Sequence, residues 1–541
     1  MSQFINHKDS LVTDALDGYL HTSNLVRLDG YPHIKVVTRA NIASDKVALI
    51  SGGGSGHEPA HAGFVGSGML TAAVCGEVFA SPSVEAVLAA ILAVTGDAGS
   101  LLIVKNYTGD RLNFGLAAER AKALGKQVEM VVVADDIALP DIAQPRGVAG
   151  TLFVHKIAGH MAEQGATLAQ VATVAREVAS RARSYGAALS SCNVPGMEKT
   201  QRIDSGMAEL GLGIHGEPGV ETVQFETASQ ICNTLLSALF NDTTDSSAVV
   251  LLINNLGSTT PLEMQAILNI IASSEFAPRI SGIIGPDLLM TSLDMHGFSL
   301  STLPADSTYL EALKADCEPS AWPGCTAITP IAVQALPDGL TQSAYPASAN
   351  AAMRTLITSC CDSFSAMETD LNLLDAKTGD GDTGSTVAQG ARSLQNDLDQ
   401  LPLDDQTLLL RAISDQLATS MGGSSGVLLA ILFSAAADAC DKGQSGVHAL
   451  RAGVEKMMEY GGAEVGHRTM VDALVPALDA LCAGGSLQDA ASAARAGADS
   501  TQAMTRARSG RSAYVPEASL SGVTDPGAEG VARVFESLAD Q

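Results

Sequence analysis

Two patterns of hydrophobic residues divide the chain. Over residues 46–340, short runs of apolar, often β-branched residues alternate with amphipathic segments such as Leu112–Leu124. Short apolar strands separated by helices are typical of a parallel sheet that is covered on both faces. We therefore predict strands at five runs: Lys46–Ser51, Leu101–Lys105, Val128–Val133, Val249–Ile253 and Ile280–Ile284.

Beyond about residue 345 the pattern changes to helical spacing. Ala, Leu and Met dominate and β-branched runs disappear. The spacing predicts helices over Thr407–Ser420, Gly426–Cys440, Val447–Tyr460 and Met470–Cys482. We predict a multidomain protein in which an N-terminal α/β domain precedes a C-terminal all-α helical bundle or barrel. The expected bounds are 1–335 for the α/β domain (lobes about 1–190 and 191–335, joined through Ser190–Gly219), 336–348 for a linker and 349–541 for the helical domain.

Composition and charge exclude several classes of protein. The 541 residues include 32 Lys and Arg against 59 Asp and Glu, a formal net charge of −27. Such a surface repels phosphate backbones and anionic lipids, so we expect neither nucleic acid nor a membrane as a partner. The polar N-terminus does not resemble a signal peptide, and the apolar stretch Val427–Phe433 is too short to cross a bilayer. Nine cysteines without a C-x-x-C pair argue against disulfides or a zinc ribbon, so we expect a cytoplasmic protein.

The first candidate site follows the predicted strand Lys46–Ser51. Gly52–Pro59 contains four glycines within five residues, followed by His57 and Glu58. Such a loop lets backbone N–H groups approach a small oxygen-rich ligand at the carboxyl end of a strand. It is not a P-loop, and the G-x-G-x-x-G spacing also fails. A flexible turn without a ligand is the alternative.

Two further turns carry polar groups. Lys105 and Asp110 follow the next predicted strand, and they converge with His57 if the two strands are neighbours; a solvated turn is the alternative. His215 lies in Gly211–Gly219, where its His-Gly-Glu-Pro motif resembles the one at His57. Because a neutral imidazole is a nucleophile as well as a base, His215 can add to a ketone and form a hemiaminal.

The helical region contains a second candidate site. Asp375, Asp380 and Asp382 are interrupted by glycines and cannot share a helix face. A turn that folds three carboxylates inward needs a cation, and few hard oxygen ligands suit Mg²⁺ that is also bound to substrate phosphates. The spacing excludes an EF-hand, and a solvated acidic turn is the alternative.

An anion site is predicted beside the aspartates. Met421–Gly426 precedes an apolar helix, so free N–H groups and two hydroxyls can bind phosphate. The same letters match G-x-S-x-G, but a helix precedes them, which argues against a serine nucleophile. Arg468 and Arg511 lie beside glycine-rich turns and can neutralise phosphate.

Five motifs, in this order, resemble those of the single-chain, ATP-dependent dihydroxyacetone kinases. They are Ser51–His61, Lys105–Asp110, Gly211–Pro218, Gly379–Gly384 and Met421–Gly426. The resemblance covers essentially the whole chain, including the change of domain near residue 345. It implies ATP-dependent phosphorylation of dihydroxyacetone with Mg²⁺, by a homodimer with exchanged domains in which the helical domain presents ATP to the α/β domain.

The resemblance also implies a role for each matching residue. His215 holds the substrate ketone as a hemiaminal, His57 is in acid/base contact, and Asp110 is the base for the attacking hydroxyl. The implied triose-binding residues are Gly54, Ser55, Gly56, His57, Lys105 and Asp110. The implied Mg²⁺ ligands are Asp375, Asp380 and Asp382. The implied nucleotide contacts are Asp380, Gly381, Asp382, Thr383, Ser424, Ser425, Gly461, Thr469, Met470, Arg511, Asp525, Pro526 and Gly527.

The chain departs from the family pattern at His467, where relatives usually read Gly-Asp-Arg-Thr-Met, and after Tyr514. Two other kinds of enzyme stay open: a kinase for another short ketose such as erythrulose or for glyceraldehyde, and a lyase that cyclises FAD. A third alternative is a regulator that senses a carbonyl compound without turnover. The aspartates and the phosphate site argue against this regulator, which needs no Mg-ATP.

Overall fold

The computed structural model describes residues 3–139, 142–197, 202–241, 248–337, 344–444 and 446–540. It divides into two compact units, Met1–Ala332 and Val333–Gln541, which are described separately below. Residues 338–343 of the expected linker lie outside the described residues, as do residues 198–201 of the expected passage between the lobes.

The first sheet of the N-terminal unit has six strands in the order β1-β2-β4-β3-β5-β6. The strands β4, β3, β5 and β6 are parallel, and β2 and β1 continue the sheet in antiparallel orientation. The strand bounds are β1 Leu25–Arg27, β2 Val36–Arg39, β3 Ala48–Ser55, β4 Ala72–Val78, β5 Ser100–Lys105 and β6 Val128–Val133. The helices of this half are α1 Leu11–His21, α2 Val84–Val94, α3 Thr108–Ala123, α4 Thr151–Glu163 and α5 Leu168–Arg181.

Helices cover both faces of this sheet, which explains its continuous apolar strands. Alternate residues of β3 point to opposite faces. Ala48 and Ile50 pack in the core beneath α2 and α3, whereas Leu49 packs in the core beneath α4 and α5. Every residue of β3 is buried.

The second sheet has seven strands in the order β13-β11-β10-β12-β7-β8-β9. Their bounds are β7 Arg183–Ala188, β8 Met207–Leu210, β9 Glu221–Gln224, β10 Val249–Asn255, β11 Ile280–Leu288, β12 Gly297–Pro304 and β13 Cys325–Thr326. The helices that follow these strands are α6 Ala228–Asn241, α7 Pro261–Ala272 and α8 Ser307–Lys314. The first strand of this sheet, β7, begins before the lobe boundary expected at about residue 190.

All five predicted strands are present, as β3, β5, β6, β10 and β11. The prediction of parallel sheets is right for the first sheet and wrong for most of the second. Among the described strands of the second sheet, only β10 and β11 pair in parallel, through the crossover helix α7. The chain then returns directly through residues 289–296 into β12, which pairs antiparallel with both β10 and β7. A connection without a helix permits only the antiparallel return.

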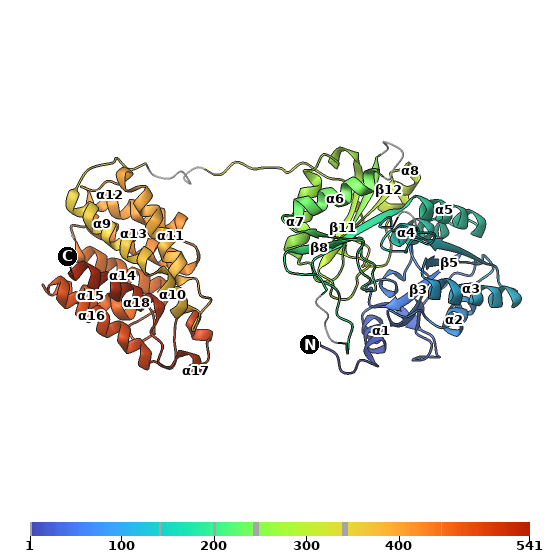
Figure 1. The fold of residues 1–541 in the computed structure, drawn as a ribbon, viewed down its shortest axis with the longest axis horizontal. Helices are drawn as coiled ribbons and strands as arrows, with labels where there is room; N and C mark the ends of the chain where they lie inside the picture. The colour runs from blue at the N-terminus through green and yellow to red at the C-terminus, as the bar shows by residue number, and fades with distance from the viewer. Residues whose placement is uncertain are drawn as a thin grey trace. The chain divides into compact units, whose positions relative to one another are not determined.

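The elements of regular secondary structure that the structure describes in the C-terminal unit are all helices, as predicted (Figure 1). Its helices are α9 Ala351–Ala366, α10 Glu368–Asp375, α11 Thr383–Asn396, α12 Gln406–Ser420, α13 Gly423–Asp441, α14 Val447–Gly461, α15 Val471–Cys482, α16 Leu487–Ser500, α17 Glu517–Leu520 and α18 Pro526–Ala539. An alanine cluster on α15, α16 and α18 lets these three helices approach closely.

The helix α13 is 19 residues long and apolar enough, by length and composition alone, to cross a membrane. It includes Val427–Phe433, the apolar stretch that is by itself too short to cross a bilayer. Within the unit it packs against α12 and α14, as the core helix of a bundle does.

Candidate active site

The glycine-rich segment belongs to strand β3 and does not form the predicted loop. The strand runs to Ser55, with an irregular register against β4 between Gly53 and Ser55. A Cβ on Gly52 would collide with the backbone carbonyl of Val74, and one on Gly54 would lie 2.7 Å from the amide nitrogen of Ala80. The glycines therefore allow neighbouring backbone to approach the end of the strand.

Lys105 and Asp110 converge on this strand end, because β5 is the parallel neighbour of β3. Lys105 ends β5, and Asp110 lies in the first turn of α3. A Cβ on Gly53 would lie 3.2 Å from Lys105 Nζ and 3.4 Å from Asp110 Oδ2. Both side chains are buried, and Asp110 Oδ1 has no hydrogen-bonding partner. An unpartnered buried carboxylate oxygen is available to accept a proton or a hydroxyl hydrogen bond.

His57 is positioned by the second sheet of the same unit. Its Nδ1 lies 2.8 Å from the carbonyl oxygen of Thr291, in the β11–β12 connection. Because a carbonyl only accepts, Nδ1 carries the proton and Nε2 is left as a buried acceptor without a partner. Burial, together with the charges of Lys105 and His215, holds the pKa of His57 well below its ordinary value of 6.5. The neutral ring can therefore accept a hydrogen bond at Nε2 but has no proton to give there.

His215 meets His57 ring edge to ring face, with centroids 4.9 Å apart. It lies in the connection between β8 and β9 and contacts the ring of Tyr107, with centroids 4.4 Å apart. Its Nδ1 is 3.3 Å from Glu217 Oε1, and its backbone N–H donates to Glu217 Oε2. Although burial alone raises the pKa of Glu217, the bonds and charge of His215 lower it to about 2. A carboxylate acceptor at Nδ1 favours the tautomer in which Nε2 carries the nucleophilic lone pair.

The structure adds four residues that the sequence analysis did not single out: Phe79, Tyr107, Thr291 and Glu217. Glu217 and Tyr107 had a signal, because they lie within the motifs Gly211–Pro218 and Lys105–Asp110. Phe79 and Thr291 lie outside the motifs, and their contacts with the histidines depend on the folded structure.

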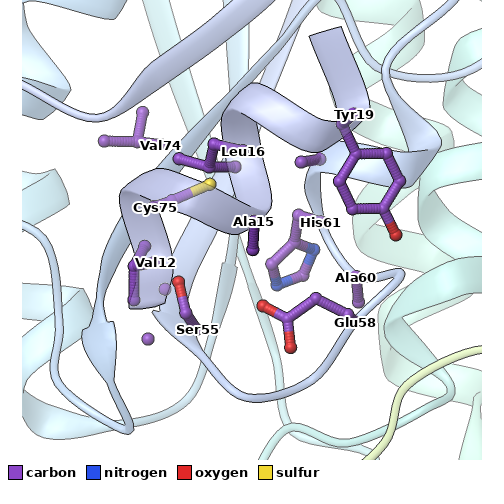
Figure 2. Close-up of a pocket in the computed structure, with 13 residues that line it drawn as sticks. Val12, Ala15, Leu16, Tyr19, Ser55, Glu58, Ala60, His61, Val74 and Cys75 are labelled. Carbon is purple, nitrogen blue, oxygen red and sulfur yellow. The ribbon is translucent and has the colours of Figure 1, made fainter. Parts of the chain in front are cut away.

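A small cavity of about 10 Å³ lies between α1 and the end of β3 (Figure 2). Its lining includes Tyr19 of α1, Ser55 and Cys75 of the strands, and Glu58 and His61 (Figure 2). The volume is that of about one water molecule, so the cavity is not large enough for a triose.

The three aspartates of the helical unit form one cluster, at the end of α10 and the start of α11. One ligand atom from each of Asp375, Asp380 and Asp382 lies within 4.8 Å of the others. Asp375 Oδ2 accepts three backbone N–H groups, from Gly381, Asp382 and Thr383, which folds the loop inward. The separation is close to the span of oxygens around Mg²⁺ at ~2.1 Å, so this donor set fits the ion.

Arg511 is the positive partner of this cluster. Its Nη1 contacts Asp380 Oδ2 and lies 3.8 Å from Asp382 Oδ1. All three side chains are about half exposed. The cluster therefore already attracts a cation from its own chain.

The aspartates border a cavity of about 720 Å³ between the helices. Of the implied nucleotide contacts, all except Gly381 line it: Asp380, Asp382, Thr383, Ser424, Ser425, Gly461, Thr469, Met470, Arg511, Asp525, Pro526 and Gly527. Ser424 and Ser425 lie in the first turn of α13, where the first N–H groups have no partner within the helix. Leu428, Met457 and Met470 add an apolar part to the wall. The polar end with cation ligands suits the phosphates of a nucleotide, and the apolar part suits its base.

Arg468 and Asp525 are two buried side chains of opposite charge in the wall of this cavity. Arg468 is 1% exposed and donates through Nη2 to the carbonyl of Val523, while its Nε and Nη1 have no partner. Burial raises the pKa of Asp525 to about 6, although its Oδ1 accepts the N–H of Ala528 at the start of α18.

This burial predicts a pH-dependent stability. Between about pH 4 and pH 6 the folded chain retains a proton on Asp525 that the unfolded chain has lost, so stability falls as the pH rises through this window. Asp525→Asn keeps the helix cap without the charge. The unfolding free energy of the variant minus that of wild type is expected to be larger at about pH 7 than at about pH 4, by roughly 1–3 kcal/mol. Urea unfolding followed by far-UV circular dichroism checks this, and an equal difference at both pH values contradicts it.

His467, the departure from the family pattern, lies outside the lining of this cavity. Its Nδ1 is 3.1 Å from Ser509 Oγ, which in turn donates to the carbonyl of Gly462. Ser509 and Arg511 both line the cavity. The imidazole thus connects the segment that carries Arg511 to the turn before α15.

Comparison with known proteins identifies the family of both units. A Dak1 domain matches residues 18–321 and a DAK2 domain matches residues 377–540. The chain is 48% identical to dihydroxyacetone kinase of Citrobacter freundii, over 100% of this chain and 99% of the relative. It is 39% identical to the Homo sapiens triokinase/FMN cyclase, over 99% of each.

A solved structure extends the agreement to three dimensions. The crystal structure of the C. freundii dihydroxyacetone kinase in complex with AMP-PNP and Mg²⁺ matches with a TM-score of 0.75 and 46% identity, over 100% of this chain and 99% of that one. Together, the two domains in this order and the full-length similarity place the chain in the dihydroxyacetone kinase family.

Proposed function

We propose that this protein phosphorylates dihydroxyacetone with ATP, giving dihydroxyacetone phosphate and ADP. The observation that carries the proposal is His215, whose Nδ1 faces Glu217 and whose ring lies against His57. A nucleophilic imidazole beside a second histidine is suited to a carbonyl compound, and the C. freundii relative is a dihydroxyacetone kinase.

Capture of the ketone begins at Nε2 of His215. The Nε2 lone pair attacks the carbonyl carbon, the carbonyl π pair moves to oxygen, and that oxygen takes up a proton to become a hydroxyl. The ring loses its Nδ1 proton, so the neutral hemiaminal has the same atoms as imidazole plus ketone. Glu217 stabilises the positive charge on the ring while Nε2 bonds to carbon, and Nε2 of His57 accepts a hydrogen bond from the new hydroxyl.

The terminal hydroxyl is then activated at the strand end. Asp110 accepts its proton through the unpartnered carboxylate oxygen, and Lys105 donates a hydrogen bond that orients it. The hydroxyl oxygen attacks the γ-phosphorus of ATP and ADP leaves. Phosphoryl transfer depends mainly on positioning and on charge neutralisation, which these groups supply.

The helical unit binds the nucleotide in its 720 Å³ cavity. Asp375, Asp380 and Asp382 would hold Mg²⁺, and the start of α13 with Ser424 and Ser425 binds phosphate. When bound, Mg²⁺ neutralises charge on the phosphates. Arg511 supplies a second positive group at the same end of the cavity.

Covalent capture predicts that kcat/KM depends strongly on whether the substrate has a carbonyl group. Glycerol has the same terminal hydroxyls but no carbonyl to trap, so we expect its kcat/KM to be lower than that of dihydroxyacetone by roughly 100-fold or more, about 2.7 kcal/mol. A coupled assay of ADP release with dihydroxyacetone, erythrulose, glyceraldehyde and glycerol measures this. Equal turnover of glycerol and dihydroxyacetone contradicts the proposal.

The same assay separates the alternatives. A kinase for another short ketose turns over erythrulose in preference, and a carbonyl sensor releases no ADP with any compound. The human relative is named as an FMN cyclase as well as a triokinase, so cyclisation of FAD is tested by adding FAD in place of the ketose. The nucleotide cavity beside the carboxylate cluster argues against a sensor, and the dihydroxyacetone kinase of C. freundii, 48% identical, supports the triose as substrate.

We also propose that the protein is a cytoplasmic homodimer in which the two chains exchange their helical domains. The support is the family resemblance and the linker-like composition of residues 336–348. Multi-angle light scattering at assay concentration is expected to give about twice the mass of one chain. A monomeric mass contradicts the dimer and leaves the proposed reaction untouched.

A further inference from the structure

Lys105 has a buried neighbour to which the reaction above gives no role. His61 Nε2 lies 3.2 Å from Lys105 Nζ, and both side chains are almost completely buried. His61 follows the strand end by a few residues, and its ring also borders the small cavity beneath α1 (Figure 2). The contact connects this ring with the group that orients the substrate hydroxyl.

The proton arrangement of this contact follows from the chemistry of the two groups. An ammonium group has only donors, so Nε2 of His61 must be the acceptor and the ring must carry its proton on Nδ1. A second charge beside Lys105 in this dry environment is unfavourable, and burial with the Lys105 charge holds the pKa of His61 well below 6.5. His61 is therefore a neutral acceptor for a buried cation.

The cost of burying this imidazole argues that it is not simple packing. Nδ1 of His61 has no hydrogen-bonding partner, and neither nitrogen of His155, whose ring centroid is 5.2 Å away, has one. Each unpartnered buried donor costs about 1–3 kcal/mol, which an apolar side chain of similar size avoids. The hydrogen bond to Lys105 is the one polar contact that the His61 side chain makes among the described residues.

A neutral acceptor does what a carboxylate at this position does not. It fixes one N–H of the ammonium group and leaves the charge intact, so two N–H groups remain free to point toward Asp110 and the substrate. A carboxylate would form an ion pair and draw Nζ away from the strand end.

Resting on the proposed function, we propose that His61 is a positioning residue for the phosphorylated hydroxyl. Its Nε2 holds Lys105 Nζ beside Gly53, in reach of Asp110 and the triose. His61 touches neither the triose nor the nucleotide and acts only through Lys105.

Three substitutions at this position test the role. The Oε1 of Gln reaches the place of Nε2, the Oδ1 of Asn reaches only that of Nδ1, and Leu offers no acceptor. We expect His61→Gln to stay within about threefold of wild type, because it keeps the acceptor. We expect His61→Asn and His61→Leu to lose roughly 10-fold or more in kcat/KM for dihydroxyacetone, with the KM for ATP unchanged. Steady-state kinetics of ADP release, with each substrate varied while the other is saturating, measures both constants.

A matched control uses the neighbouring histidine. His155→Leu changes the same buried pair of rings without touching Lys105, and we expect its kinetic constants to stay within about twofold of wild type. The inference is overturned if His61→Gln is as impaired as His61→Leu, or if Leu and Asn are as active as wild type. If the Leu variant does not fold, as a thermal unfolding scan reports, the Gln and Asn pair decides the question. Failure of the proposed function is separate, since the wild type then releases no ADP with dihydroxyacetone.

Discussion

Replacing His215 with alanine is expected to raise the KM for dihydroxyacetone at least roughly 100-fold while the KM for ATP stays within about twofold. The reason is the loss of Nε2, the atom that forms the bond to the carbonyl carbon, whereas the nucleotide cavity belongs to the helical unit. Intact-protein mass spectrometry of the protein mixed with dihydroxyacetone should show the mass of one added triose on wild type and none on the variant.

Two comparisons make this result specific. His296→Ala removes a histidine of the same unit that contacts Glu263, and it is expected to behave like wild type. Glu217→Gln leaves the nucleophile in place but removes the charge that favours its reactive tautomer, so its KM should fall between the two. If His215→Ala keeps the wild-type KM and still retains a triose in the mass spectrum, the hemiaminal is wrong.

Asp380→Asn is expected to lower kcat/KM for Mg-ATP by roughly 1,000-fold, about 4 kcal/mol. The substitution removes one of three carboxylates in the cluster and also the group that Arg511 contacts. A coupled assay over a range of Mg²⁺ concentrations measures the loss, and the triose adduct on His215 should still form.

The exposed Asp404 provides the control for this change, because it lies in the same unit outside the cavity lining. Asp404→Asn should leave the Mg²⁺ dependence unaltered. If Asp380→Asn has full activity at an ordinary Mg²⁺ concentration, the carboxylate cluster takes no part in the reaction.

The sequence predicts best those elements whose hydrophobic pattern is typical of one kind of secondary structure. Strands such as β5 and β10 are buried at every position and contain the continuous apolar runs Leu101–Val104 and Val249–Ile253. β12 is equally buried but alternates apolar and polar residues, and its serines pair with Asn254 and Ser184 inside the unit. Such polar positions look solvent-exposed until their partners, tens of residues away, are known.

The candidate sites follow the same division. The aspartate cluster was predictable because its three carboxylates come from one short turn. The convergence of Lys105 and Asp110 was predictable once two strands were assumed to be neighbours. The contact of His57 with Thr291 spans 234 residues and depends on how two sheets pack, which no local pattern encodes. The buried Arg468, in the left-handed region with φ of 63°, likewise depends on the surrounding helices.

The position of Arg511 has a consequence for the order in which metal and nucleotide associate. A divalent ion arriving alone must displace a guanidinium group from Asp380 and leave it without an anion. An ion that arrives with a triphosphate would bring phosphate oxygens for the guanidinium group of Arg511, so the carboxylates could hold the metal without leaving Arg511 unpaired. The contact between Arg511 and Asp380 would therefore favour association of the metal and the nucleotide as one complex.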